Sequence, residues 1–327
     1  MAKKAVKLTI MILVAVMVFS GCSMMGKQVK YGFIDKTGNF IIQPQYSGAI
    51  SFYEGLAGVM VGDEQLGKWG FVDMKGNMVI EAKYDQVRGF YEDLCPVKTG
   101  KDEKAVWTFI DTKGSNIING DYKDASVFVR GMAPVKFPKE GKYGFIDNEG
   151  KTLIAPKFDM ASIFSEDLAL YGVASGESMK TGFIDRDGNV VIEAQYAYCG
   201  AFSEGLSSVK KSSDQEAADW GFMDKSGKII IEPQYAWARS FKEDLAAVKI
   251  GDGKNGKWGY INKAGEIVIE ARFGLALEFS EGLAAVLEGD ENTGKFGYID
   301  KTGKYVLDPQ FSRAGTFSQG LAPAAAE

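Results

Sequence analysis

Carboxylates are the most abundant side chains in this sequence that could carry out acid–base chemistry. The 327 residues include 43 Asp and Glu but no histidine. The lack of histidine excludes Ser-His-Asp and Cys-His catalysis and the common zinc sites. Two carboxylates could still hydrolyse a glycosidic bond without histidine. A carboxylate-based glycosidase is therefore one hypothesis for this chain.

Many of these acids, however, recur at the same two places of a repeated phrase, which indicates a role in folding. A catalytic pair should interrupt the repeat, and the sequence has no exceptional cluster of acids. The stretch from Asp185 to Asn189 partly matches a calcium loop, but it lacks the distal Glu and coincides with a turn found in every copy. No GxxxxGK[ST] phosphate loop occurs. We predict that the chain is not an enzyme and holds no metal or cofactor.

The repeated phrase is the strongest signal in the sequence. Examples are KWGFVDMKGNMVIEAKY at 68–84, DWGFMDKSGKIIIEPQY at 219–235 and KWGYINKAGEIVIEARF at 257–273. Eight copies follow one another over residues 31–327. The position of the first aromatic recurs every 36 to 39 residues, at Tyr31, Trp69, Trp107, Tyr143, Thr181, Trp220, Trp258 and Phe296.

Each copy has the features of a β-meander. A turn that ends in Gly separates two β-branched or aromatic runs, and a Phe and then an Ala-Val run follow. This pattern predicts three antiparallel strands, with room for a fourth short strand before the Phe. Both faces of the strands are apolar, so neighbouring copies must cover each other. The predicted fold class is all-β, with eight tandem antiparallel β-meander repeats of about 38 residues.

The phrase Gly-Lys-Trp-Gly-Phe/Tyr-Ile-Asp, with the later Phe-Ser-Glu-Gly-Leu-Ala, resembles the WG-repeat (KWG) family of bacterial β-repeat proteins. The resemblance covers residues 31–327. The sequence departs from the pattern at Thr181, which replaces the aromatic, and at Thr108, which replaces the Gly. The resemblance implies a β-repeat scaffold, frequent on secreted or surface proteins, without a common enzymatic activity.

Two architectures fit eight such units. The chain begins with the second clear strand of a unit and ends with the first, an offset that would let the N-terminal strands complete the last blade of a closed, propeller-like ring. Small residues in the Ala-Val run would suit an innermost position in that ring. An open β-solenoid or superhelix also explains the repeats. We favour the ring.

The first 30 residues predict export. Lys3, Lys4 and Lys7 precede a short apolar run, which describes a signal peptide over residues 1–21. Ser20-Gly21-Cys22 resembles a bacterial lipobox, so Cys22 is the candidate lipidation site and residues 22–30 the tether; an ordinary signal peptide is the alternative. Cleavage would change the net charge from −5 to −8, because three lysines and no acids are lost. This acidity argues against a nucleic-acid partner.

Cys95 and Cys199 stand where other copies carry small residues, so small apolar slots explain both cysteines and no disulfide is expected.

One position of the repeat varies in an informative way. Two residues after the aromatic that closes the β-branched run, four consecutive copies carry large apolar side chains: Met160, Tyr198, Trp237 and Leu275. Stacked copies would align these four as a candidate binding ridge. The alternative is that they pack into the neighbouring unit. The WG tryptophans suit the core.

We therefore predict an extracytoplasmic, lipid-anchored lipoprotein at the cell surface or outer membrane, with membrane contact through the lipid only. The expected partner is an envelope protein or a cell-envelope polysaccharide. A self-associating structural envelope protein and the glycosidase are the alternatives.

Overall fold

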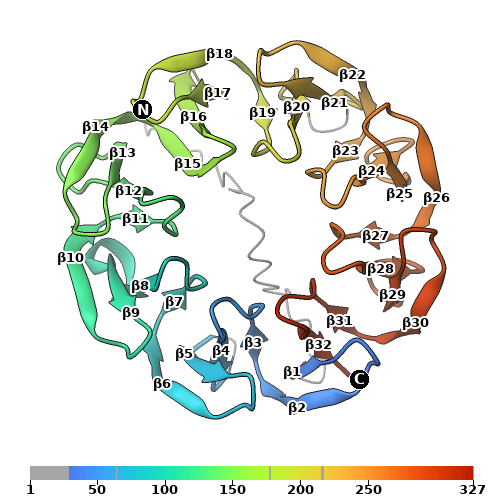
Figure 1. Cartoon of the computed structure of the whole chain (residues 1–327), viewed down its shortest axis with the longest axis horizontal. Coiled ribbons are helices and arrows are strands. Elements are labelled where there is room, and N and C mark those ends of the chain that lie inside the picture. The colour runs from blue at the N-terminus through green and yellow to red at the C-terminus, as the bar shows by residue number, and fades with distance from the viewer. Residues whose placement is uncertain (1–28, 64, 177, 215–216, 327) are drawn as a thin grey trace, which may run out of the picture.

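The chain forms a closed ring of β-sheets, an eight-bladed β-propeller (Figure 1). The computed structural model describes residues 29–326 except 64, 177 and 215–216. Within these residues there are eight antiparallel four-stranded sheets and one short 3-10 turn, η1 (Asp102–Lys104). The predicted all-β class and the favoured ring are confirmed, and the open solenoid is not the architecture.

Every blade has the same strand order from the centre of the ring to its rim. The innermost strands are β3 (Gly48–Ala49), β7 (Gln86–Val87), β11 (Asp124–Ala125), β15 (Met160–Ser165), β19 (Tyr198–Cys199), β23 (Trp237–Ala238), β27 (Leu275–Ala276) and β31 (Arg313–Ala314). The second strands are β4 (Leu56–Val61), β8 (Leu94–Thr99), β12 (Ala133–Lys136), β16 (Leu168–Ser175), β20 (Leu206–Lys210), β24 (Ala246–Ile250), β28 (Ala284–Glu288) and β32 (Ala322–Ala325).

The two outer positions are filled in the same way. The third strands are β5 (Lys68–Asp73), β9 (Val106–Asp111), β13 (Tyr143–Ile146), β17 (Ser178–Ile184), β21 (Trp220–Asp224), β25 (Lys257–Ile261), β29 (Lys295–Ile299) and β1 (Tyr31–Ile34). The rim strands are β6 (Met78–Tyr84), β10 (Asn116–Tyr122), β14 (Thr152–Phe158), β18 (Val190–Tyr196), β22 (Ile229–Tyr235), β26 (Ile267–Phe273), β30 (Tyr305–Phe311) and β2 (Phe40–Tyr46). We number the blades 1 to 8 from the one that contains β3.

Blade 8 joins the two ends of the chain. Its sheet order is β2-β1-β32-β31, and β1 pairs with β32 from Tyr31↔Ala325 to Ile34↔Ala322. The N-terminal strands thus complete the last blade, as the repeat offset predicted. The expectation that the Ala-Val strand lies innermost was wrong. A two-residue strand takes that place in seven blades and the six-residue β15 in blade 4, and the second residue of each is Ala, Val or Cys.

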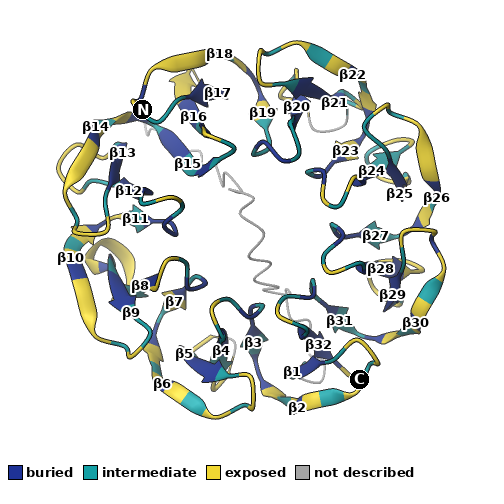
Figure 2. Cartoon of the chain, viewed as in Figure 1, coloured by how far each residue is buried: buried dark blue, intermediate teal, exposed yellow. Residues whose placement is uncertain are grey.

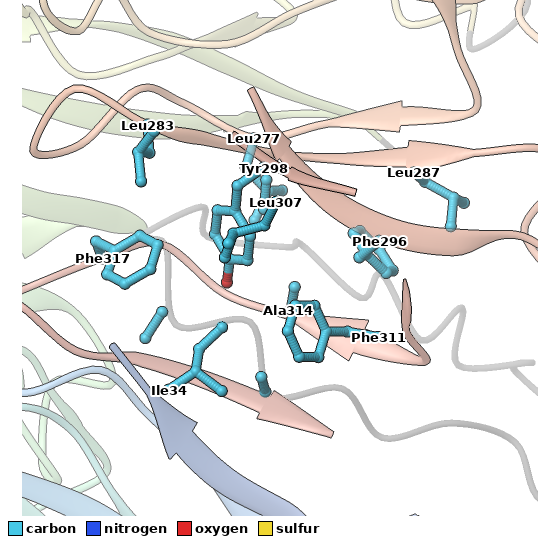
Figure 3. Close-up of a cluster of buried hydrophobic side chains, with 13 residues drawn as sticks. Ile34, Leu277, Leu283, Leu287, Phe296, Tyr298, Leu307, Phe311, Ala314 and Phe317 are labelled. Carbon is cyan, nitrogen blue, oxygen red and sulfur yellow. The ribbon is translucent and has the colours of Figure 1, made fainter. Parts of the chain in front are cut away.

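The apolar core lies between blades, and among the strands it is the rim strands that carry most of the exposed residues (Figure 2). A ring in the third strand of each blade packs on the repeated Phe of the next blade, with centroids 4.6 to 5.0 Å apart. Figure 3 shows the pair Tyr298 and Phe317 with Ile34 in the cluster between blades 7 and 8. Each blade is therefore covered by its neighbours, which closes the core only when the ring closes.

The Gly of the WG phrase is required by the rim strand. At Gly221, a Cβ would lie 2.5 Å from the carbonyl oxygen of Ile231 in β22, and the other WG glycines meet the same contact. Blade 2 has Thr108 at this position, and its rim strand instead contains Gly120 and a left-handed Asp121 (φ 48°). In this blade, the glycine that allows the third strand and the rim strand to approach closely lies in the rim strand instead of the third strand.

Candidate functional site

The two faces of the ring differ in the connections that they carry. The loop face carries the connections between second and third strands, such as residues 251–256 and 289–294, and the innermost strands begin there. The turn face carries the connections between first and second strands and the Gly-ending turns between third and rim strands.

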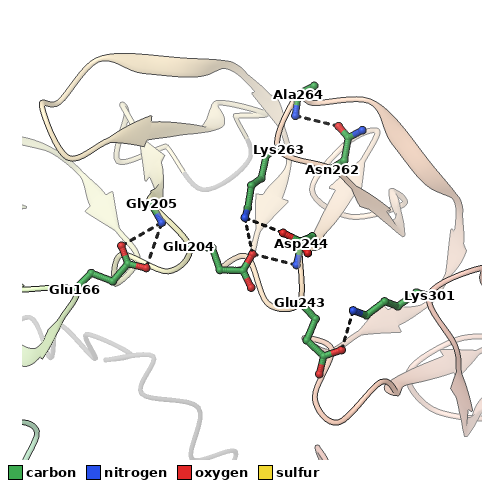
Figure 4. A network of polar contacts seen from close by, with 9 residues as sticks. All are labelled: Glu166, Glu204, Gly205, Glu243, Asp244, Asn262, Lys263, Ala264 and Lys301. Carbon is green, nitrogen blue, oxygen red and sulfur yellow. Dashed lines mark hydrogen bonds and ion pairs between the residues drawn. The ribbon is translucent and has the colours of Figure 1, made fainter.

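The turn face holds the repeated acids, and their carboxylates join one blade to the next. The Glu166 carboxylate accepts the Gly205 N–H at 3.1 Å, and Glu204 accepts the Asp244 N–H at 3.0 Å (Figure 4). Glu243 accepts the Gly282 N–H in the same way. Lys225 pairs with Glu166 at 3.1 Å. The same contact joins blade 8 to blade 1, where Gln319 Oε1 accepts the Gly55 N–H at 2.8 Å. These acids therefore serve the ring.

The acids of the other turn are also used by the fold. Asp185 Oδ1 accepts the N–H groups of Asp187 and Asn189 at 3.0 and 2.8 Å, and Oδ2 accepts the Asn189 side-chain amide at 3.0 Å. The partial calcium loop is thus a hydrogen-bonded turn. No cluster of three or more metal-binding side chains occurs in the part of the chain that the structure describes.

The four ridge residues all start innermost strands, so the structure brings them to the loop face of blades 4 to 7. They differ in exposure. Tyr198 and Trp237 are each 37% exposed, whereas Leu275 is half-buried and Met160 is buried. Met160 pairs with Gly172, which pairs with Thr181. Because Gly172 and Thr181 are both small, they leave space in which the Met160 side chain can be buried against the sheet.

Tyr198 and Trp237 are connected by a third ring that we assigned to the core from the sequence. Trp220 is buried and stacks with Tyr198 at 6.3 Å and 22°, and it packs against Trp237 of the next blade at 5.3 Å and 36°. We call Tyr198, Trp220 and Trp237 the aromatic platform. The strand register could have suggested this stack, because Tyr198 and Trp220 both pair with Lys210.

Two lysines fix the loops beside the platform. Lys210 is buried, and its ammonium binds the Asp219 carboxylate and the Ala217 carbonyl oxygen. Lys249 donates to the Gly253 carbonyl oxygen at 2.6 Å. Burial raises the pKa of Asp219, but Lys210 and Ser212 outweigh it and hold that pKa below its ordinary value. Each lysine thus binds a described residue of the loop that follows its strand.

The cysteine predictions have separate outcomes. Cys95 and Cys199 are both free, in agreement with the expectation that they form no disulfide. Cys95 is fully buried, and burial raises the pKa of its thiol well above the ordinary value. Cys22 and the signal peptide lie outside the described residues. Among the described residues, no helix combines the length and apolar character needed to cross a membrane.

A family model described as WG containing repeat matches eight segments of the chain, residues 31–64, 69–101, 107–143, 143–172, 182–213, 220–254, 258–291 and 296–325. No curated protein matches the chain.

Two solved structures share the fold. One is the β-propeller domain of the Trilobed protease from Pyrococcus furiosus, described as having an open velcro topology (12% identity, 86% of this chain and 99% of that chain, TM-score 0.52). The other is prolyl oligopeptidase B from Galerina marginata (10% identity, TM-score 0.56). That match covers 86% of this chain and 51% of the other. At this identity the likeness concerns the propeller fold alone.

Proposed function

Because the chain belongs to the WG containing repeat family over all eight blades, we propose that this propeller is a lipid-anchored, extracytoplasmic scaffold that binds a cell-envelope polysaccharide. The basic and apolar N-terminus with Ser20-Gly21-Cys22 supports export and lipidation at Cys22. In this proposal the lipid is the membrane contact, at the cell surface or outer membrane.

The observation that carries the binding proposal is the aromatic platform. Tyr198 and Trp237 are the large aromatic side chains that remain more than one third exposed within the described residues, and Trp220 joins them across two blades. Exposed aromatic faces stack on the apolar C–H faces of pyranose rings, and Tyr and Trp provide rigid contact area. A polysaccharide could extend from this platform along the loop face.

We propose binding without turnover. The repeated acids that a glycosidase would need are engaged in contacts between blades and in turns. The partners of Glu166, Glu204 and Glu243 are backbone amides and lysines of the next blade. Their arrangement supports the ring and provides no carboxylate pair at the platform.

The test compares binding of the mature protein with a Tyr198→Ala/Trp237→Ala double variant, by calorimetry with purified wall polysaccharide. The matched control is Ile230→Ala/Val268→Ala, which removes two similarly exposed side chains from the rim of the same blades. We expect the platform variant to lose roughly tenfold or more in affinity, because buried aromatic contacts carry most binding energy. The control should bind like the wild type.

Equal affinity of the two double variants would contradict the platform. Platform-dependent capture of an envelope protein, with no binding of polysaccharide, would contradict the ligand class and favour a protein partner. Thermal unfolding of both variants checks that the ring is intact.

A further inference from the structure

Two arginines occupy equivalent positions in blades 2 and 6, and the first is fully partnered. The Arg88 guanidinium lies over Trp107 at 5.0 Å. Its Nε donates to the Ala125 carbonyl oxygen at 2.7 Å and its Nη2 to Asp124 Oδ1 at 3.2 Å, both in blade 3. Asp124 also accepts the Tyr143 hydroxyl at 2.6 Å. This junction shows the set of acceptors that such a guanidinium uses.

Arg239 makes the same ring contact but lacks the same acceptors. Its guanidinium lies over Trp258 at 5.2 Å, and the residue is only 8% exposed. Leu275 stands where the other junction has Asp124, so blade 7 offers no carboxylate at that place. Nε of Arg239 has no hydrogen-bond acceptor, and Nη1 forms only a long ion pair with Glu278 Oε1 of blade 7, at 3.9 Å.

The position of Arg239 connects it with the aromatic platform. Arg239 follows Trp237 by two residues, just after β23, and it lies over Trp258, which pairs with Lys249 as Trp237 does. A desolvated guanidinium with an unused donor is costly, and its planar fork fits a carboxylate. A ligand carboxylate at this junction would supply the acceptor that Asp124 supplies to Arg88.

We propose that the ligand of the aromatic platform is acidic, a uronate-containing glycan whose carboxylate is recognised by Arg239. This inference rests on the proposed polysaccharide function and adds the chemical class of the sugar. The overall negative charge of the chain would repel such a ligand. Selection of an acidic glycan therefore needs a local guanidinium, and Arg239 supplies it beside the aromatic platform.

The test uses an array of uronate oligosaccharides, each paired with its methyl ester, which keeps the sugar ring and removes only the charge. We expect the wild type to bind the acids roughly tenfold more tightly than the esters, the range of one charge-assisted hydrogen bond. Arg239→Gln should bring that ratio close to one without loss of ester binding. Leu275→Asp should do the same, because it places an internal carboxylate where blade 3 has Asp124.

Arg88→Gln is the matched control, since it removes the equivalent guanidinium at a junction far from the platform. It should lower stability and leave the acid-to-ester ratio unchanged. Equal binding of acids and esters by the wild type would contradict the acidic selectivity while leaving the platform intact. Binding of neither probe would contradict both the acidic ligand and the glycan function. The wild-type ratio decides the inference even if a variant fails to fold.

Discussion

At the scale of single residues, deviations from the repeat are compensated by neighbours. Thr181 replaces an aromatic ring, and its hydroxyl donates to the Tyr196 carbonyl oxygen at 3.2 Å, while Met160 two strands away in the same sheet is buried. Thr108 replaces the WG glycine, and Gly120 appears in the paired rim strand. The repeat therefore constrains pairs of positions more strongly than single ones.

The WG glycine provides a prediction at this scale. Gly221→Ala should destabilise the propeller by roughly 1–3 kcal/mol, because the new Cβ would lie 2.5 Å from the Ile231 carbonyl oxygen. Thr108→Ala, at the equivalent position of blade 2, should change the free energy of unfolding by much less. Chemical denaturation of both variants measures the difference. Equal destabilisation would contradict the steric explanation.

The sequence predicts repeated residues better than exceptional ones. The Phe of every copy, such as Phe241, and the turn glycines were correctly assigned to the fold, because their recurrence has one physical explanation. The exposure of Met160 could not be predicted, since it depends on Thr181 two strands away. The missing acceptor of Arg239 likewise depends on a residue in the next blade, Leu275, which adjacency in sequence does not reveal.

At the scale of elements, the tight connections on the turn face combine strain with contact. Glu166 adopts a left-handed backbone (φ 52°), as do its counterparts in the other blades. Glycine would suit this backbone better. The strained residue is Glu because its carboxylate reaches the Gly205 N–H of the next blade. Local strain is thus offset by a contact between sheets.

This contact should weaken in acid. Burial raises the pKa of Glu166, but Lys225 and the Gly205 N–H outweigh it, so the folded-state pKa lies below the ordinary value of 4.5. A depressed pKa means that the stabilisation is complete above pH 4.5 and declines as the pH falls toward the folded-state value. Glu166→Gln should cost roughly 1 kcal/mol near neutral pH and progressively less in acid.

The measurement is the difference in free energy of unfolding between wild type and variant across this pH range. Gln319→Ala is the matched control, because Gln319 makes the same contact through an uncharged amide. Its cost should not depend on pH. A constant cost for Glu166→Gln would show that the charge of the carboxylate does not contribute.

At the scale of the whole molecule, the ring is joined by the pairing of β1 with β32. Ser318 donates to the Phe52 carbonyl oxygen across the next junction, and Phe33 packs on Phe52 with centroids 4.8 Å apart. The junction between blade 8, where the chain ends meet, and blade 1 therefore uses the same kinds of contact as the other junctions between blades. This equivalence predicts that the ring unfolds as one unit.

Removal of residues 1–47, and with them β1 and β2, should abolish cooperative unfolding and expose apolar surface to a dye such as ANS, since Phe317 and Phe52 would lose their cover. A circular permutant is the control: a short linker joins residue 326 to residue 29, and the new ends lie between Gly253 and Lys254. It keeps every strand and should unfold like the wild type. Unchanged cooperativity of the truncated chain would contradict coupling through the pairing of β1 with β32.

The pairing of β1 with β32 also sets an order of events during biosynthesis. The first strand made, β1, can pair with β2 at once, but its second partner β32 emerges from the ribosome or the export channel on the order of 15 to 60 s later at ordinary elongation rates. Until then the apolar edge of the strands made first stays uncovered. A holdase, or threading of the unfolded chain across the membrane, would have to protect it for that interval.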